Sequence, residues 1–167
     1  LSIFFYLKSE KSSEISYQFE ETSSLLYDSS NLTSTIIILD KDSLPIKKNV
    51  YLINGTIWNS GDYEIKKNDI RKPLNILLDK NSKIIDFKIL EEKDKSISNF
   101  KLKKVSSNNL KVDWDYFDPK FGFKFQIIYE DLKPSSLTLK GKILNIEEFN
   151  NQNINSFYNK TLPDSFM

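Results

Sequence analysis

Turn-forming residues recur about every ten positions along this chain, and that spacing restricts the possible folds more than any other feature. The segments between the turns alternate apolar and polar side chains, as half-buried strands do. In the longest of them, Val50–Trp58, Ile53 and Ile57 share one face. No stretch of the sequence has the apolar period of an amphipathic helix. The sequence therefore predicts an all-β domain, an antiparallel β-sandwich of about seven to nine strands.

The limits of this domain follow from local composition. Thr35–Leu39 is a continuous run rich in β-branched residues, which predicts a strand covered on both faces. Glu91–Asn99 is strongly charged, which predicts a solvated loop. From Asn150 the chain becomes polar and low in complexity. We therefore expect residues 15–149 to form the sandwich and residues 150–167 to be a polar tail or linker.

The overall composition fits one soluble globular domain. At 167 residues the chain is long enough for a substantial core, and 39% hydrophobic with 28% charged residues is not the composition of a disordered segment. Its 24 basic and 23 acidic residues give a formal net charge of +1. Bulk electrostatic attraction to nucleic acid is therefore not expected, and no nucleic-acid partner is predicted.

The chain contains no cysteine and no histidine. Disulfides, thiolate catalysis, Cys/His zinc sites and Ser-His-Asp triads are excluded, because each requires one of these side chains. The sequence also has no glycine-rich phosphate loop, since only four glycines are present. It therefore predicts a non-catalytic domain without a cofactor.

The N-terminal run Leu1–Leu7 is apolar and is followed by Lys8 and Lys11, as at the end of a membrane helix with a basic flank. Residues 1–14 are therefore predicted to be membrane-proximal, with membrane contact through the segment before Lys8. A buried edge strand is the alternative, because seven residues are far fewer than the roughly 20 that span a bilayer. The two lysines favour the cytoplasmic side, but two nearby glutamates balance them, so the side stays open.

One turn separates the longest strand from the segment that follows it. Asn59 and Gly61 lie in the sequence Asn-Ser-Gly-Asp, and both residue types tolerate the positive φ that tight turns require. Pro73 is expected to end the crossing that follows the turn. Asp69 has no packing role in the sequence pattern, so its carboxylate is predicted to accept backbone N–H bonds within the loop.

A set of short motifs, each explained by a structural role, follows in a definite order along the chain. They are Thr56–Gly61, Ile65, Asp69-Ile70 and Pro73-Leu74, then Asp118-Pro119 with Phe123, Phe125 and Ile127, and finally Leu139–Ile143. This pattern, over residues 34–147, resembles the immunoglobulin-like β-sandwich domain of uncharacterised bacterial membrane-anchored proteins. The resemblance implies an immunoglobulin-like sandwich beside a membrane helix, and it carries no assigned activity.

Four aromatic residues, Trp58, Trp114, Tyr116 and Phe117, are candidates for a platform that binds a sugar or a peptide. The alternative is that they fill the core, because burial of a large ring is the largest single packing gain available. The sequence favours the core for the two tryptophans.

Lysines are concentrated around the predicted strands near residue 105. Lys101, Lys103, Lys104 and Lys111 form a basic stripe that could meet an anionic lipid or a nucleotide. Lysines on an edge strand also protect a sheet from edge-to-edge aggregation, and the sequence favours this simpler role.

The densest acidic cluster is Asp113, Asp115 and Asp118. Oxygen ligands at alternate positions suit Ca²⁺, but the cluster lacks the glycine and the distal glutamate of an EF-hand loop. The favoured interpretation is solvent-facing carboxylates beside a core tryptophan, so no metal site is predicted.

These observations favour a non-catalytic recognition or scaffolding module that binds a protein partner, or another copy of itself, through a sheet face or edge. The alternative is a ligand-sensing domain for a small anionic molecule or glycan, coupled to the membrane segment. Its binding residues would be Lys101, Lys103, Lys104, Trp58 and Tyr116. A hydrolase that uses carboxylates alone is weaker, since it needs two of them roughly 5 to 10 Å apart across a cleft. The recognition module predicts no deep polar pocket, whereas the sensor predicts a concave site where lysines or exposed aromatics converge.

Overall fold

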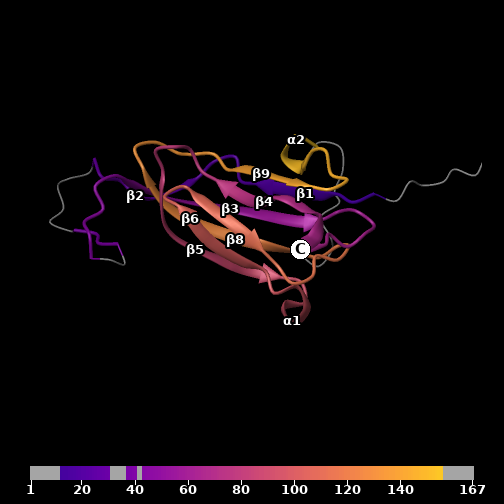
Figure 1. Ribbon diagram of the computed structural model, residues 1–167. Coiled ribbons are helices and arrows are strands. Elements are labelled where there is room, and N and C mark those ends of the chain that lie inside the picture. The colour runs from indigo at the N-terminus through magenta and orange to yellow at the C-terminus, as the bar shows by residue number, and fades with distance from the viewer. Residues whose placement is uncertain (1–11, 31–36, 41–42, 156–167) are drawn as a thin grey trace, which may run out of the picture.

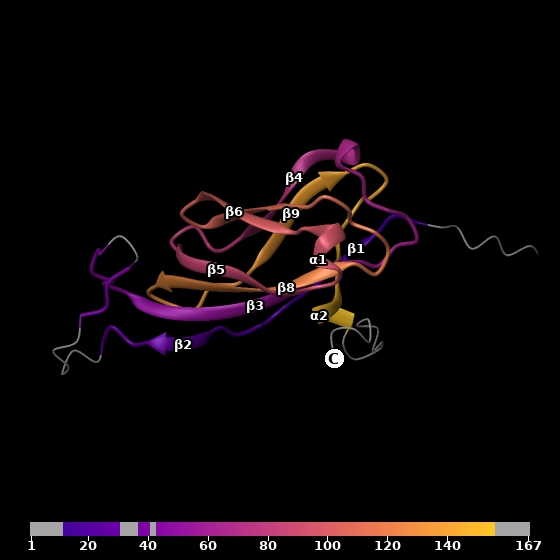
Figure 2. The ribbon, with the colours of Figure 1, turned by 90° about the horizontal axis from the view of Figure 1, so that it is seen from below.

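The computed structural model of the protein describes residues 12–30, 37–40 and 43–155. Within them the chain forms two β-sheets that pack face to face (Figures 1 and 2), which confirms the predicted antiparallel β-sandwich. The described residues form ten strands, slightly more than the predicted range. Two of the ten are short strands without an alternating pattern. They are β2 (Ser24–Tyr27), in a serine-rich connection, and β10 (Asn150–Asn151), in the predicted polar tail.

The larger sheet contains six strands in the order β10-β1-β3-β8-β5, and β2 pairs with β3 as well. Besides the two short strands, its members are β1 (Ile15–Phe19), β3 (Asn49–Asn59), β5 (Lys83–Glu92) and β8 (Gly122–Asp131). All its pairings are antiparallel except that of β1 with β10.

The smaller sheet contains four antiparallel strands in the order β6-β7-β4-β9. They are β4 (Ile70–Leu77), β6 (Lys101–Ser106), β7 (Asn109–Asp113) and β9 (Thr138–Ile143). The order β1-β3-β8-β5 is the A-B-E-D order of an immunoglobulin sandwich, and β4 with β9 takes the places of strands C and F. The hairpin of β6 and β7 extends the smaller sheet on the β4 side.

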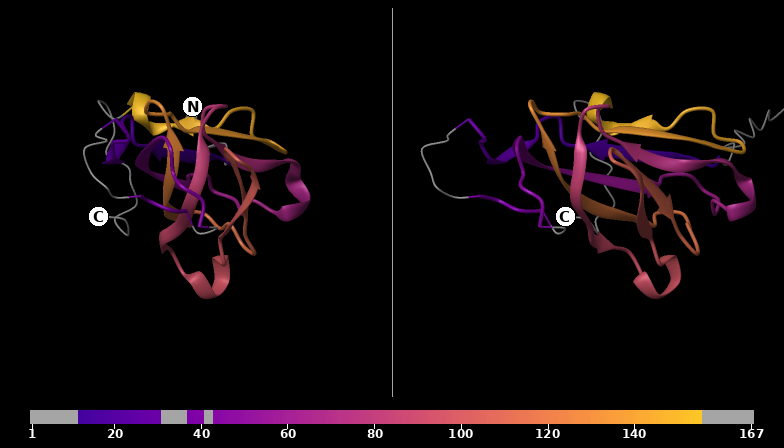
Figure 3. Two further views of the ribbon diagram at one scale, coloured as in Figure 1. Left: turned by 90° about the vertical axis from the view of Figure 1, so that its left-hand side faces the viewer. Right: turned by 60° about the vertical axis from the view of Figure 1, so that its left-hand side comes forward.

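Helical structure in the described chain is limited to single turns. They are η1 (Lys67–Asp69), α1 (Lys95–Ser98) and α2 (Gln152–Asn155). Helix α2 lies near β1 and α1 lies on the opposite side of the sandwich (Figure 3). The segment predicted as a charged loop from residue 91 thus continues β5 to Glu92 and then forms α1.

The core consists of the apolar halves of the alternating strands. On β8, every second side chain from Phe123 to Tyr129 is fully buried, and Ile53 and Ile57 of β3 are buried beside them. Leu74 of β4 and other apolar residues of the smaller sheet meet them from the other side. The period-two pattern in the sequence therefore produces two apolar sheet faces, and their burial against each other stabilises the sandwich.

The turn after β3 is built differently from the prediction. Neither Asn59 nor Gly61 has a positive φ. Asn59 is fully buried, and its side-chain amide donates to the carbonyls of Tyr63 and Phe117, both at 2.8 Å, while its oxygen accepts the N–H of Gly61 at 3.0 Å. Gly61 is required for space, since a Cβ there would lie 2.5 Å from the backbone nitrogen of Glu14.

The predictions for Asp69 and Pro73 were also wrong in their physical reasons. Within the described chain, the Asp69 carboxylate accepts no hydrogen bond, and it is the Asp69 carbonyl that accepts the N–H of Leu144, at 2.8 Å. Pro73 does not end the crossing but lies inside β4, where the register with β9 shifts between Lys72 and Asn75. A bulge is one of the few places in a sheet that tolerates a residue without an N–H.

Two other segments differ from the sequence-based expectation. Of the predicted buried strand Thr35–Leu39, residues 35 and 36 lie outside the described residues. Ile37 and Leu39 are 73% and 52% exposed, and Leu39 forms only an isolated bridge with Pro45. The predicted tail begins as part of the sheet, because β10 pairs with β1 and Phe149 packs against the core.

Candidate functional site

A cleft of about 810 Å³ lies between β5 and β6. These strands are the last members of the two sheets, and each pairs with a strand on one side only within the described chain. The sandwich is therefore open along this side, with the backbone of one strand on each wall. Figure 2 shows β5 and β6 in their respective layers.

Both ends of the cleft are closed by the chain itself. At one end α1 links β5 to β6, and Lys95 of α1 lines the cleft. Beyond the other end, the N–H of Ile84 donates to the carbonyl of Ser107 at 2.7 Å, and Lys104 Nζ donates to the Ile84 carbonyl. These contacts hold the two edge strands together beyond the cleft and fix its length.

The floor of the cleft is apolar. Phe87, Ile89, Phe100 and Leu102 line it and pack against the hydrophobic core. The ring of Phe100 lies 4.7 Å from that of Phe123, between ring centroids, which connects the floor to the centre of the sandwich. The floor is therefore held in place by buried neighbours, as in a preformed binding site.

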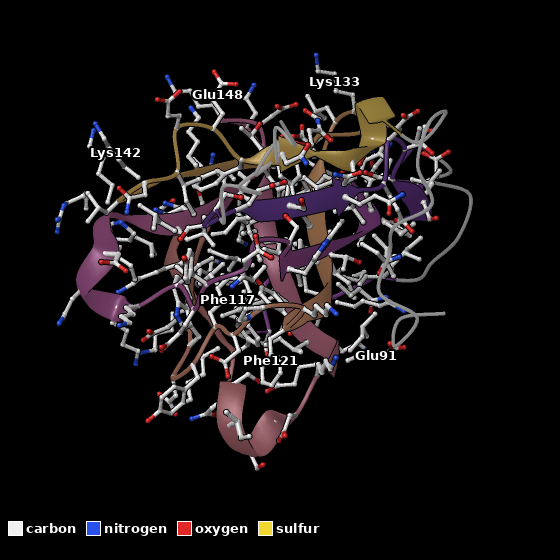
Figure 4. The ribbon with its side chains drawn as sticks, turned by 90° about the vertical axis from the view of Figure 1, so that its right-hand side faces the viewer. Glu91, Phe117, Phe121, Lys133, Lys142 and Glu148 are labelled. Carbon is white, nitrogen blue, oxygen red and sulfur yellow. The ribbon has the colours of Figure 1, made fainter. Side chains whose placement is uncertain are left out.

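The rim of the cleft is basic. Lys88, Lys93, Lys95 and Lys101 all line it. The Nζ atom of Lys93 lies 5.9 Å from the centroid of the Phe121 ring, which places this ammonium group over an aromatic face. Figure 4 labels Phe121 and Glu91 on this side of the protein.

Two carboxylates of the cleft already interact with neighbouring groups of the protein. Glu91 Oε2 lies 3.0 Å from Lys124 Nζ in an ion pair. Glu92 Oε1 accepts hydrogen bonds from Ser98 Oγ at 3.2 Å and from the Phe100 N–H at 3.4 Å. The positive charge of the rim therefore exceeds the negative charge that is left unpaired.

Each wall of the cleft contains a short regular stretch of strand. On β5 the register shifts on both sides of residues 86–89, and on β6 the pairing is regular over residues 101–104. Bulges interrupt an edge and limit pairing with other chains. The regular stretches thus leave about four residues on each wall, or roughly 13 Å of extended backbone, available for pairing.

Three lysines of the predicted basic stripe, Lys101, Lys103 and Lys111, share one face of the smaller sheet. Lys101 also lines the cleft, and Lys103 Nζ lies 3.6 Å from an Asp113 carboxylate oxygen. Lys104 reaches toward β5 instead. Lys103 and Lys104 are adjacent on β6, so their side chains point to opposite faces of the sheet.

The aromatic residues are also divided. Trp58, Trp114 and Phe117 are buried, and Trp114 Nε1 donates to the Ile65 carbonyl at 3.2 Å. Tyr116 is 54% exposed and lines a separate cavity of about 430 Å³ near α1. These four residues therefore do not form a shared aromatic platform for a ligand.

The acidic cluster is engaged with nitrogen donors. Asp115 accepts from Asn99 Nδ2 at 2.7 Å and from Lys67 Nζ at 3.3 Å, and these contacts lower the pKa of its carboxyl. Asp113 lies between Lys67 and Lys103. Among the described residues, no group of three or more carboxylates is arranged to hold a metal ion, and this applies to Asp113, Asp115 and Asp118 as well.

Sequence reasoning missed most of the cleft. Lys88, Lys93 and Lys95 and the apolar floor belong to segments that were expected to be an ordinary strand and a solvated loop. The run of charge at residues 91–95 was a signal that this connection carries more than a turn. It gave no indication that β5 and β6 end two different sheets and face each other.

No protein-family profile, curated protein or solved structure matches the chain. In the described part of the chain, no helix has the length and apolar character required to cross a membrane.

Proposed function

We propose that this domain is a non-catalytic recognition module of a membrane-associated protein, and that it binds an extended, acidic segment of a protein partner in the cleft between β5 and β6. One observation carries the proposal: two unpaired strand edges face an apolar floor beneath a rim of four lysines. The membrane association rests on the apolar run Leu1–Leu7 and on the resemblance described above.

An extended peptide is the ligand class that uses all three features. Its main chain would pair with the regular stretch of an edge strand, as in other cases of β-strand addition. Alternate side chains of a strand point to opposite sides, so apolar residues would contact the floor at Ile89 and Leu102 while acidic residues face the lysines.

A small anionic molecule is the second candidate. Lysines from β5, α1, β6 and the β5–α1 connection converge on this concave site, and a volume of about 810 Å³ falls within the range of small-molecule pockets. This convergence is the feature expected of the ligand-sensing alternative. The peptide is preferred because a small anion leaves the strand edges and much of the apolar floor without a partner.

The test measures binding of a fluorescein-labelled peptide of alternating Glu and Val by fluorescence anisotropy. Replacement of Lys88 and Lys95 by Glu should weaken binding about tenfold or more, because two favourable charge contacts become repulsive. The matched control replaces Lys80 and Lys133 by Glu, which changes the net charge equally at exposed positions outside the cleft. The control should bind as the unchanged protein does.

A second peptide separates main-chain pairing from charge attraction. N-methylation of alternate residues removes N–H donors but keeps every side chain, so it should abolish binding if a strand edge is used. Equal binding by both lysine variants would overturn the proposal. Binding of inorganic phosphate that depends on Lys88 and Lys95, without peptide binding, would overturn it in favour of the small-anion alternative.

A further inference from the structure

The outer face of the four-stranded sheet carries an unusual concentration of lysines. Residues paired in register share one face of a sheet. A continuous row therefore crosses all four strands, in the order Lys140, Asn75, Lys111 and Lys103. Beside it lie two further pairs, Lys72 with Lys142 and Lys101 with Asp113. We call these eight residues the basic sheet face.

The charge on this face does not reflect the chain as a whole. Six lysines and one aspartate give it a formal charge of +5, whereas the entire chain has a net charge of +1. Asp113, its one acid, already lies within 4 Å of Lys67 and Lys103. The outer face of the larger sheet differs, because there Lys124 pairs with Glu91 at 3.0 Å and Lys83 with Glu130 at 3.6 Å.

Two pairs of like charges lie directly opposite each other. Lys72 faces Lys142 between β4 and β9, and Lys103 faces Lys111 between β6 and β7. Like charges in directly opposed positions destabilise a sheet. None of Lys72, Lys111 and Lys142 has an ion pair with any described residue. The fold therefore retains a repulsive arrangement that an anionic partner would relieve.

Protection of sheet edges does not account for this arrangement. That role applies to lysines on edge strands. Lys72 and Lys111 belong to β4 and β7, which have a paired strand on each side. Lys142, on the edge strand β9, projects from the surface in Figure 4.

We propose that the basic sheet face docks on an anionic membrane surface. The face is one sheet wide, roughly 15 Å across four strands. Its basic rows hold no aromatic or apolar side chain, and the row next to them holds only the half-buried Leu77 between Asn109 and Thr138. Protein partners and single-stranded nucleic acids bind through aromatic or apolar anchors, which these rows lack. A lipid surface needs only an array of flexible cations, and each lysine near such a surface strengthens binding about fivefold.

Vesicle co-sedimentation of the full chain tests this assignment, with phosphatidylcholine vesicles that either contain or lack phosphatidylserine. The protein should bind the anionic vesicles more tightly than the neutral ones, and this difference should shrink as salt is added. The triple variant Lys72→Gln, Lys140→Gln, Lys142→Gln should bind about a hundredfold more weakly, from three fivefold losses.

The matched control is Lys47→Gln, Lys80→Gln, Lys133→Gln, which removes three charges from exposed positions away from the face. It should retain more binding than the face variant. The face variant should also have an unchanged or raised urea midpoint, because it removes a repulsive pair, and this shows that it is folded.

Equal loss of binding in the face variant and the control would overturn the proposal, as would equal binding to vesicles with and without phosphatidylserine. Binding to duplex DNA or to an acidic protein, with no binding to anionic vesicles, would overturn it and assign the face to that partner. Lys101 belongs to both surfaces, but none of the variants changes it. The Lys88 and Lys95 variants of the cleft should retain vesicle binding, so the two proposals fail independently.

Discussion

Replacement of Asn59 by alanine should destabilise the domain by about 2–4 kcal/mol. The side chain makes three hydrogen bonds, and each contributes roughly 1 kcal/mol net. The loss of unfolding free energy should exceed that of the same hydrogen bonds at a surface site. The reason is that the Tyr63 carbonyl would be left without a hydrogen-bond donor from the described residues. The loss should not exceed the upper value, because two of the three partners keep another hydrogen bond. The Phe117 carbonyl still accepts the N–H of Ile65 at 3.0 Å, and the Gly61 N–H still donates more weakly to the Glu14 carbonyl.

Urea titration followed by tryptophan fluorescence measures this loss, because Trp58 and Trp114 are both buried and report unfolding. The matched control is Asn75→Ala. Asn75 also donates to a backbone carbonyl at 2.8 Å, but at an exposed site, so its loss should stay within about 0.5 kcal/mol. A loss below about 1 kcal/mol in Asn59→Ala, or one equal to that of the control, would refute the argument.

The variant Asn59→Asp sharpens the same prediction. It keeps the oxygen that accepts from Gly61 but turns a second oxygen toward the carbonyls of Tyr63 and Phe117. Burial and these carbonyls should raise the pKa of the new carboxyl. A raised pKa gives stability that is present at acid pH and lost as pH rises, so this variant should be most stable in acid. A variant that instead becomes more stable toward neutral pH would contradict the donor role of Asn59.

Two further predictions use the same titration. Gly61→Ala should lose about 1–3 kcal/mol, because its Cβ would lie 2.5 Å from backbone atoms, and Gly141→Ala should lose less, since the nearest atom to its Cβ would be at 3.1 Å; equal losses would contradict this reasoning. Burial raises the pKa of Tyr129 above its ordinary value of 10.0, so the related stability is complete below about pH 10 and is lost as pH rises through the folded pKa. Tyr129→Phe should reduce this alkaline loss, and an unchanged pH profile would show that another group causes it.

Period-two patterning predicted the strands well where one face is buried. Val50–Trp58 became β3 almost residue for residue, and the alternation of residues 123–129 became β8. The run Thr35–Leu39 failed in its described part because β-branched composition indicates a preference for extended backbone and says nothing about which surface covers it.

At the turn after β3, the sequence identified the important residues but not the roles that they have in the structure. Asn59 and Gly61 were identified from turn propensity, which concerns local φ and ψ. Their actual roles depend on Phe117 and Glu14, which are distant in sequence. Asp69 was assigned the role that Asn59 has, because the sequence does not show which polar side chain points inward.

The sequence by itself determined the fold class, because side-chain alternation and turn spacing are local properties that dictate sheets with one apolar face. It also determined the chemistry that is absent, since a chain without cysteine or histidine has no thiolate and no imidazole. The two candidate surfaces were decided only by tertiary structure. The cleft requires that β5 and β6 end different sheets, and the basic sheet face requires the register that sets Lys142 against Lys72 and Lys111 against Lys103. Register and strand order arise from long-range pairing, and a lysine reads the same in the sequence whichever strand lies beside it.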